Sequence, residues 1–407
     1  MPRIPGHDVT TILLNATTIN KGGGIQAAVS IIRQIIDEFQ EKDGVRWIFS
    51  VSGEVRDELA GFGYLLRDGI DVCLEQSPAK NRRSRIALRE FASAHADLVF
   101  TFFGPSYVAF TVPHLCGVAD GWVTHSSRLS YSTFPTLAEK LTKVLTCAYK
   151  SLWFRRADYW IVEQEVARAG LVRRLWLQPD NIYVISNNCS QGYIDASPAP
   201  RVKALQSTIR ILTFAADFPN KCLALIPQVA ALLVKQHCID NVQFVLTVPA
   251  QDYAHTAIAK LAAALGVERY ICNAGYVALK DGPSLYRSCD IALMPSVLET
   301  FSATYPESMR MGLPIVTSDL EFARTTCLDA AVYFKPRDPA SAAAKLAALI
   351  GDSDARARIV AAGFNRAADF PSPRDKYRQY RGVIDRMLGM DVAPNCQDIA
   401  MRAKADS

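Results

Sequence analysis

The sequence has no apolar run of the roughly 18–20 residues that a membrane-spanning helix needs. Its start, MPRIPGHDVTTILLN, lacks the basic segment and long apolar stretch of a secretory signal, so we expect none there. Ten cysteines occur without a C-x-x-C pair, which argues against zinc and against a paired redox centre. The net charge of +5 is small for the length, and it gives no reason to expect nucleic-acid binding. The scattered cysteines fit a protein of the reducing cytoplasm.

The chain is long enough for more than one core. A single core rarely exceeds about 250–300 residues, and this chain has 407, of which 50% are hydrophobic. Apolar, β-branched stretches alternate with helical patterns in both halves, which predicts parallel sheets covered on both faces. The expected fold is α/β, with two Rossmann-like, doubly wound domains facing across a cleft. The predicted strands are TTILLN, RWIFSV, DLVFTFF, DYWIVEQ, NIYVISN, IRILTFAA, VQFVLTV, DIALMPS, PIVTSD and AAVYFKP.

A stretch rich in proline, alanine and serine, ASPAPRVKALQS, separates the two halves and is the best candidate for a linker. The last residues are polar, and we expect them to be disordered. The predicted limits are an acceptor-side domain over 1–195, a linker over 196–208, a nucleotide-sugar domain over 209–370, a helix over 371–390 that packs back on the first domain, and a tail over 391–407.

The segment MPSVLETFSATYPESMRMGLPIVTSD carries the most information about chemistry. An apolar strand ends in it, a loop follows, and a helix begins near Thr304 and ends at Gly312. Glu299 lies in the loop and Glu307 near the helix start. Amide N–H groups at such a helix start, around residues 301–303, can bind phosphate oxygens. A carboxylate can accept hydrogen bonds from sugar hydroxyls, but two solvent-exposed acids at a helix start would give the same pattern.

This segment resembles a known family. The run E-T-F-S-A-T-Y-P-E matches the E-x7-E signature of retaining glycosyltransferases of family 4, which have the GT-B fold. The flanking stretches GYVALKDGPSLYRSCDIALMPS, SDLEFARTTCLDAAVYFKPRDP and ILTFAADFPNKCLALIP resemble the same family. In the first half, NKGGGIQAA and FTFFGPSYVAFTVPHLCGVADGW resemble members that build bacterial surface polysaccharides, such as O-antigen, capsule or exopolysaccharide. The resemblance covers about residues 10–385.

The resemblance implies a role for each matching position. Glu299 would contact the donor sugar at the reacting centre, and Glu307 would hold the ribose. Lys221 would neutralise the leaving diphosphate, which gains negative charge in the transition state. The backbone of 301–303 would bind the diphosphate, and 275–277 would lie against the base. The implied donor-binding residues are Lys221, Gly275, Tyr276, Val277, Glu299, Phe301, Ser302, Ala303 and Glu307. The glycine loop of the first half adds Gly24 to the expected donor-binding residues.

Two departures from the family pattern concern the donor side. The family has an arginine five residues before the lysine, and Ala216 stands there, so half of the basic clamp is missing. Thr300 and Ser302 replace two glycines, which predicts less backbone freedom in the loop.

A third departure concerns the reacting centre. Many members carry a histidine after a strand of the first domain, and Ala119 stands at that position. His114 is expected within the strand itself. Asp120 is therefore the candidate stand-in for the catalytic group. These departures keep an inactive homologue open as an alternative.

The implied reaction transfers a sugar from a UDP- or GDP-sugar to a glycan or lipid-linked glycan, with retention and without a metal. The only D-x-D is DSD at 352–354, where we expect it to cap a helix. Two basic stretches, 80–89 and 139–160, mix lysine and arginine with bulky apolar residues, which suits peripheral binding to an anionic membrane at its cytoplasmic face. A half-buried helix with a solvated basic face would look the same.

Three rival functions remain open. One is a nucleotide-sugar 2-epimerase of the same fold, and another is a non-catalytic scaffold in a polysaccharide assembly complex. The third is a dinucleotide oxidoreductase, because Gly22, Gly24 and Ala27 satisfy G-x-G-x-x-G/A. In that fingerprint the glycines follow the strand directly, whereas residues 16–21 intervene here. We instead expect the N–H near Gly24 to face the phosphates of the donor, although a plain flexible turn fits as well.

Overall fold

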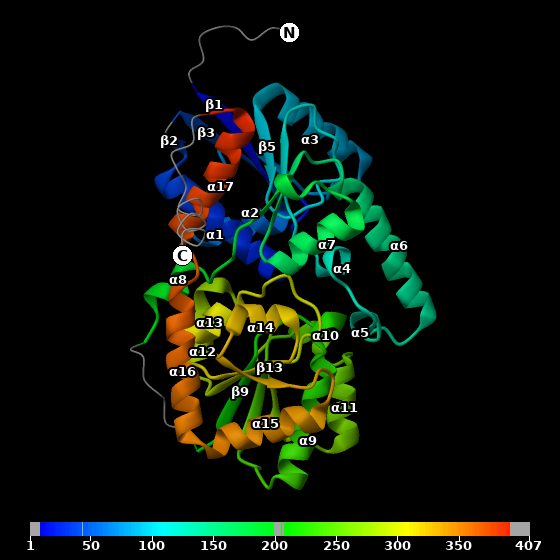
Figure 1. Cartoon of the computed structure of the whole chain (residues 1–407), viewed down its shortest axis with the longest axis vertical. Coiled ribbons are helices and arrows are strands. Elements are labelled where there is room, and N and C mark those ends of the chain that lie inside the picture. Colours follow the sequence, from blue (N-terminus) through cyan, green and yellow to red (C-terminus); the bar gives the residue numbers. More distant parts are fainter. Residues whose placement is uncertain (1–8, 43, 199–204, 206, 391–407) are drawn as a thin grey trace, which may run out of the picture. The chain divides into compact units, whose positions relative to one another are not determined.

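The computed structural model describes residues 9–42, 44–198, 205 and 207–390. By its internal contacts the chain divides into two compact units (Figure 1). The first unit comprises the described residues of Met1–Ala119, Thr146–Ser186 and Pro371–Ser407, and the second comprises those of Asp120–Leu145 and Asn187–Phe370. The predicted domain limits stay a prediction, because a division by contacts reports packing and not independent folding. Most of the predicted linker, and all of the predicted tail, lie outside the described residues.

The first unit is built on one mostly parallel sheet with the strand order β2-β3-β1-β5-β6-β7-β8, and β4 pairs with β3. Only the pairing of β2 with β3 is antiparallel among the described strands. Since β1 pairs with β3 on one side and β5 on the other, the strand order reverses between β1 and β5. The strands are β1 (Thr10–Ala16), β2 (Glu41–Lys42), β3 (Val45–Ser52), β4 (Val72–Leu74), β5 (Leu98–Thr101), β6 (His114–Gly117), β7 (Tyr159–Val162) and β8 (Ile182–Val184).

Helices cover this sheet with amphipathic faces. In α1 the buried residues Val29, Ile32 and Ile35 recur at helical spacing and join the core. The C-terminal helix packs into the same core: the rings of Tyr377 and Phe39 stack with centroids 3.8 Å apart. The helices are α1 (Gly23–Glu38), α2 (Gly53–Gly61), α3 (Arg82–His95), α7 (Glu165–Leu175) and α17 (Pro373–Leu388), with α6 (Leu137–Phe154) contributing its second half.

The second unit contains a parallel sheet with the order β11-β10-β9-β12-β13-β14. Its order reverses between β9 and β12. The strands are β9 (Ile209–Thr213), β10 (Val242–Leu246), β11 (Ile271–Asn273), β12 (Ile291–Met294), β13 (Ile315–Ser318) and β14 (Ala331–Phe334). The helices are α4 (Gly121–Thr124), α5 (Arg128–Tyr131), α8 (Gln191–Asp195), α9 (Ile226–Gln236), α10 (Ala250–Tyr253), α11 (Ala257–Leu265), α12 (Gly282–Arg287), α13 (Thr304–Arg310), α14 (Glu321–Cys327), α15 (Pro339–Gly351) and α16 (Ser353–Ala368).

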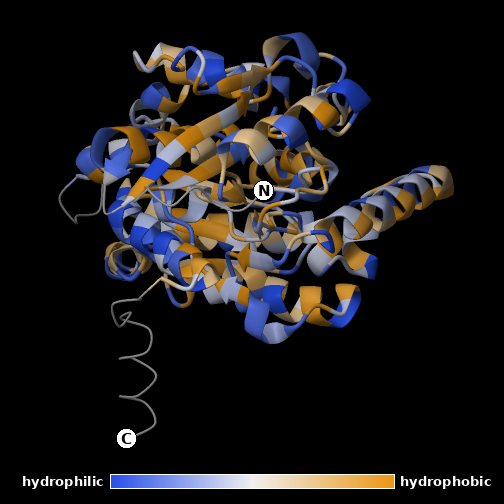
Figure 2. Cartoon of the chain, turned by 90° about the horizontal axis from the view of Figure 1, so that it is seen from above, coloured by the Kyte–Doolittle hydropathy of each residue, from blue (hydrophilic) through white to orange (hydrophobic). Residues whose placement is uncertain are grey.

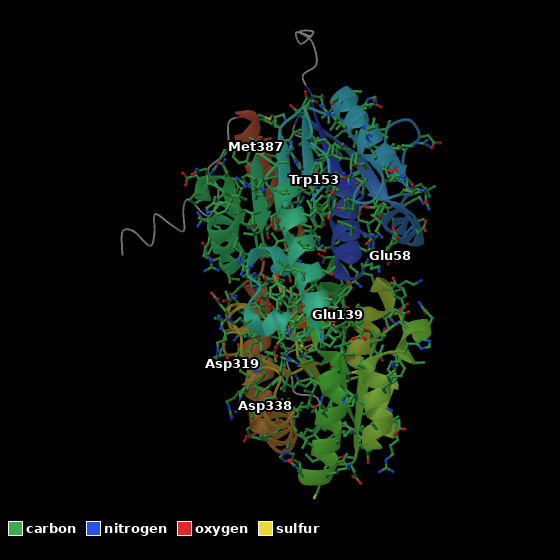
Figure 3. The ribbon with its side chains drawn as sticks, turned by 90° about the vertical axis from the view of Figure 1, so that its right-hand side faces the viewer. Glu58, Glu139, Trp153, Asp319, Asp338 and Met387 are labelled. Carbon is green, nitrogen blue, oxygen red and sulfur yellow. The ribbon has the colours of Figure 1, made fainter. Side chains whose placement is uncertain are left out.

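Several expectations about local structure are confirmed. Every predicted strand is present, and α13 begins at Thr304. Asp352 caps α16, because its Oδ1 accepts hydrogen bonds from the N–H of Asp354 and of Ala355, as expected for the DSD sequence. Asp338, labelled in Figure 3, caps α15 in the same way. Among the described residues, no helix is long and apolar enough to cross a bilayer.

Candidate active site

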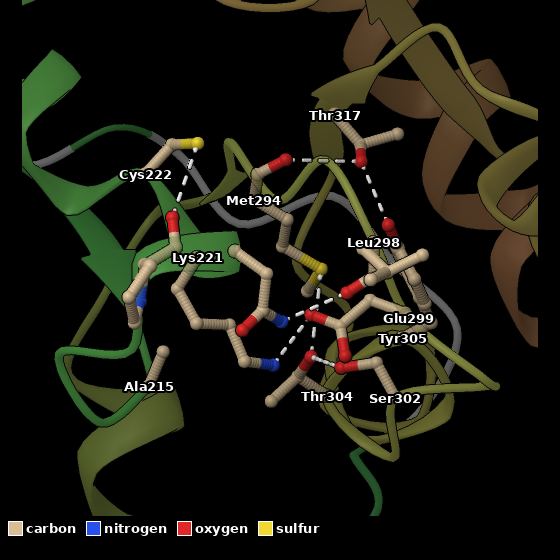
Figure 4. A network of polar contacts seen from close by, with 12 residues as sticks. Ala215, Lys221, Cys222, Met294, Leu298, Glu299, Ser302, Thr304, Tyr305 and Thr317 are labelled. Carbon is tan, nitrogen blue, oxygen red and sulfur yellow. Dashed lines mark hydrogen bonds and ion pairs between the residues drawn. The ribbon is translucent and has the colours of Figure 1, made fainter. Parts of the chain in front are cut away.

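The reversal between β9 and β12 brings two charged residues together. In open α/β sheets, ligands bind at the carboxyl ends of the strands where the order reverses. Lys221 ends the short 3₁₀ helix η2 (Pro219–Lys221) that follows β9, and Glu299 lies in the loop after β12. The lysine Nζ lies 2.5 Å from the glutamate Oε1, with side-chain exposures of 18% and 11% (Figure 4). Both residues were expected at the site from the sequence, and the structure brings them together.

Further hydrogen bonds fix the two loops to each other. The side-chain amide of Asn220 donates to the carbonyl of Leu298 over 2.8 Å. The N–H of Val297 donates to the carbonyl of Asn220, also over 2.8 Å. Because these two hydrogen bonds join the loops directly before Lys221 and Glu299, the ammonium and the carboxylate are partly preorganised for a ligand.

A histidine that was not among the expected site residues also contacts the Glu299 loop. The Nε2 of His125 lies 2.9 Å from the carbonyl oxygen of Glu299. A carbonyl can only accept, so this nitrogen carries the proton. The Nδ1 lies 2.8 Å from the hydroxyl of Thr124. One hint of this contact is present in the sequence: His125 lies six residues after Ala119, the position at which many family members carry a catalytic histidine.

Asp120, the candidate stand-in for that histidine, has a structural task. Its Oδ1 accepts a hydrogen bond of 3.0 Å from the N–H of Trp122, so it caps α4. The cap places the short helix that leads to His125. A catalytic role for Asp120 stays a prediction. His114 lies in β6, as expected, and burial lowers its pKa to about 3, so it is neutral in the core.

Glu307 is buried in α13, with only 3% of its surface exposed. The hydroxyl of Tyr286 donates to its Oε2 over 2.7 Å. Burial raises the pKa of Glu307 to about 7, although the tyrosine hydrogen bond and the charge of Lys221 act in the opposite direction. The alternative of two solvent-exposed glutamates at a helix start is therefore wrong, since the side chain of Glu299 is also mostly covered.

A second tyrosine completes the surroundings of Glu307. The ring of Tyr193, from α8, meets the ring of Tyr286 edge-on with centroids 5.4 Å apart. A Cβ at Gly282 would lie 2.1 Å from the hydroxyl oxygen of Tyr193, so only glycine fits there. Within the described part of the chain, this buried hydroxyl has no hydrogen-bond partner. The Tyr286 hydroxyl thus bonds the buried carboxylate, and the Tyr193 ring packs against that tyrosine.

The loop between the two glutamates keeps an unusual backbone conformation. Ser302 has a φ of 70°, in the left-handed region that glycine adopts without strain. The loop therefore retains the conformation that the replaced glycine would favour. Phe301 anchors it, being buried and packed edge-on against Phe370. Within the described residues, no acceptor pairs with the backbone N–H groups of Phe301, Ser302 or Ala303, so they are available to an anion.

The positions predicted to lie against the base follow β11. Gly275 has a φ of 76°, Tyr276 is 70% exposed and Val277 is half-buried. An exposed phenol ring after a strand end is suited to stacking on a planar base. Gly24 belongs to the other unit, near the start of α1, where a Cβ would lie 3.3 Å from Ile19. The roles of these residues toward a donor stay predictions.

A second cation, Arg337, acts on the Lys221 loop, whereas Ala216 stands where the family pattern has an arginine. Burial raises the pKa of the neighbouring Cys222 thiol to about 11, and the positive charge of Arg337 opposes that rise. Arg337 donates to the carbonyl of Ser132 over 2.9 Å, which holds its guanidinium in place. Among the described residues, no cluster of three His, Cys, Asp or Glu side chains could hold a metal ion.

Comparison with known proteins relates this geometry to a fold. Residues 209–352 match the model of the family described as Glycosyl transferases group 1. HepE of Anabaena, solved with UDP and glucose, superposes with a TM-score of 0.68 and 17% identity, covering 93% of this chain and 100% of that chain. The fold is GT-B.

Other solved structures agree with this assignment. A glycosyltransferase from Rickettsia africae has a TM-score of 0.66 and 16% identity, covering 93% of this chain and 99% of that one. Sucrose-phosphate synthase from Thermosynechococcus elongatus has a TM-score of 0.68 and 12% identity, again covering 93% and 99%. No curated protein matches the sequence. The expected GT-B fold is confirmed, and the match over 209–352 places the Lys221–Glu299 pair within a glycosyltransferase-like segment.

Proposed function

We propose that the protein is a retaining, metal-independent glycosyltransferase that moves a sugar from a nucleotide diphosphate sugar to a glycan or lipid-linked glycan. The observation that carries this proposal is the ion pair of Lys221 and Glu299 at the strand reversal of the second unit. It lies in the segment that matches Glycosyl transferases group 1, and the buried Glu307 follows in the next helix.

The chemistry follows from the charges of the site. The bond between the anomeric carbon and the diphosphate breaks, and a bond to the acceptor oxygen forms on the same face. The acceptor proton goes to the departing diphosphate. Lys221 stabilises the charge that develops on that diphosphate, because a fixed cation there favours the transition state over the ground state. Glu299 then accepts hydrogen bonds from the sugar, and Glu307 accepts them from the ribose.

The nature of the donor and acceptor rests on resemblance. HepE was solved with UDP-glucose, which supports a UDP-sugar, with a GDP-sugar as the alternative. The resemblance of the first half to polysaccharide-building enzymes supports an acceptor in bacterial surface polysaccharide synthesis. Ala216, where a clamp arginine is expected, favours one second candidate, a catalytically weak scaffold of a polysaccharide assembly complex.

Helix α6 supports peripheral binding at the cytoplasmic face of a membrane. Apolar residues recur along its length, and it is the long helix at the right of Figure 2. Its exposed apolar residues recur at helical spacing and therefore lie on one side of the helix. Two exposed arginines come directly after its last residue. Such a combination suits an anionic interface. The residues are Leu137, Leu141, Val144, Leu145, Leu152, Arg155 and Arg156.

The proposal is tested by incubating the protein with a panel of UDP- and GDP-sugars and alkyl glycosides, and by reading the anomeric configuration of the product by NMR. We expect a product with the configuration of the donor. Inversion would contradict the proposed reaction. Conversion of UDP-N-acetylglucosamine alone into its 2-epimer would favour the epimerase instead, and donor binding without any turnover would favour the scaffold.

A further inference from the structure

The first unit contains a pocket at its own strand reversal. Most of its lining residues follow β1, β4 and β5, and the strand order reverses between β1 and β5. The volume is about 530 Å³, which is within the usual range for small-molecule sites. Open α/β sheets bind ligands at such reversals, so this pocket lies where the fold favours a ligand.

The pocket carries an excess of positive charge. Lys80, from the loop before α3, and Lys150, from α6, both line it. Its one acidic lining residue, Glu75, is ion-paired with Arg56, which offsets the charge of that carboxylate. The remaining polar lining is made of amides and hydroxyls, which suit a sugar: Thr18, Asn20, Gln76, Ser77, Asn81 and Tyr107.

The walls of the pocket are held in place. Arg85 donates to the carbonyls of Pro78 and Ala79 over 2.5 and 2.9 Å, and these bonds fix the loop that carries Lys80. Its guanidinium also lies 5.4 Å from the ring centroid of Trp153, which is labelled in Figure 3.

The pocket lining also contains a strained aromatic residue. Tyr107 has a φ of 58°, which is unfavourable for any residue with a bulky side chain. Its ring stacks on Tyr149 of α6, with centroids 5.9 Å apart. Strain of this kind persists only where the surroundings enforce it, and it occurs preferentially at ligand sites.

We propose that this pocket binds a phosphate-bearing, hydroxyl-rich group, the glycosyl phosphate or diphosphate part of the acceptor. The inference rests on the proposed function, since it names the acceptor of that reaction. Lys80 and Lys150 bind the phosphate, and the amide and hydroxyl groups bind the sugar. The same chemistry belongs to a lipid-linked glycan diphosphate and to a soluble sugar phosphate.

Isothermal titration with glucose 1-phosphate, in the presence of saturating UDP to occupy the donor site, tests the proposal. We expect binding, and no binding of the neutral methyl glucoside. Lys80→Ala and Lys150→Ala should each weaken the affinity about tenfold, as expected for one charged hydrogen bond. Lys150→Arg should restore most of it. Lys140→Ala, on the same helix but outside the pocket, is the matched control and should change nothing.

A second arm distinguishes the source of the phosphate. Tighter binding of decyl diphosphoglucose than of glucose 1-phosphate would show a lipid-linked ligand, and equal binding would show a soluble one. Unchanged affinity in the Lys80→Ala, Lys150→Ala double variant, or equal binding of methyl glucoside, would overturn the inference. If the protein binds nucleotide sugars but none of these probes, the inference about the pocket is refuted and the proposed function is not. Binding of the probes without any nucleotide-sugar binding refutes the proposed function.

Discussion

The ammonium of Lys221 and the carboxylate of Glu299 form an ion pair of 2.5 Å although the residues are 78 positions apart in the chain. They meet because β9 and β12 are neighbours in the sheet while other strands lie between them in sequence. Both side chains are mostly covered, so their mutual attraction is screened less than that of a surface pair. An incoming diphosphate would compete with Glu299 for the same cation.

Replacing Lys221 should therefore impair turnover more than folding. We expect Lys221→Ala to lower kcat by roughly a hundredfold or more, which is typical for the loss of one group that stabilises transition-state charge. Lys221→Arg should retain part of the activity. The exposed-helix variant Lys235→Ala is the control, and steady-state kinetics is the measurement. An unchanged kcat in Lys221→Ala would remove this lysine from the mechanism.

Glu307 should make the stability of the protein depend on pH. Burial raises its pKa from 4.5 to about 7 in the folded protein. Between these values the unfolded chain has released the proton while the folded chain still binds it, so stability falls as pH rises through this window and levels off above it. The loss is on the order of 3 kcal/mol.

Urea unfolding at pH 5, 6, 7 and 8 measures this dependence. Glu307→Gln should lose most of it, because the amide does not titrate. Glu268→Gln, at an exposed position, should behave like the unmodified protein. A Glu307→Gln variant with the same pH dependence as the unmodified protein would show that another group is responsible.

The left-handed backbone at Ser302 predicts opposite effects of two substitutions. Ser302→Gly should leave the stability unchanged or raise it, because glycine adopts a φ of 70° without strain. Ser302→Val should lower the free energy of unfolding by about 1–3 kcal/mol, because a β-branched residue is disfavoured there. Denaturant unfolding compares them. Equal destabilisation by both would mean that the Ser302 hydroxyl, 2.8 Å from that of Thr304, matters more than the backbone.

The exposed leucines of α6 predict membrane binding that depends on one side of the helix. Leu141→Glu and Leu145→Glu should each reduce binding to phosphatidylglycerol vesicles tenfold or more, since burying one leucine contributes about 1.5–3 kcal/mol. Thr146→Glu adds the same charge on the opposite side of the helix and is the control. Cosedimentation measures the bound fraction. Equal losses in all three variants would point to charge alone, and no loss in any would refute the membrane surface.

The sequence was sufficient to predict the regular elements. Strands such as Ile209–Thr213 and Ile315–Ser318 are continuous apolar runs bounded by polar turns, and this pattern is local. Short strands escaped prediction for the same reason: β11 has three residues, Ile271–Asn273, and forms only because β10 offers it a partner edge.

The site was less predictable because it depends on contacts that are distant in sequence. The resemblance identified Lys221 and Glu299, but His125 is 174 positions from the carbonyl that it touches. The burial of Glu307 depends on Tyr286 and Tyr193, which come from two other helices. The helical spacing of the apolar residues in α6 did not show which side of the helix faces the protein, because the same residues could have been buried in a core.

The central claim is that the second unit binds a nucleotide diphosphate sugar through Lys221, Glu299 and Glu307. Isothermal titration of the unmodified protein and of Glu307→Ala with a panel of UDP- and GDP-sugars tests it most directly. We predict saturable binding of at least one donor and an affinity about tenfold lower in the variant, with Glu268→Ala unaffected. Equal affinity in Glu307→Ala, or no binding of any nucleotide sugar to the unmodified protein, would contradict it.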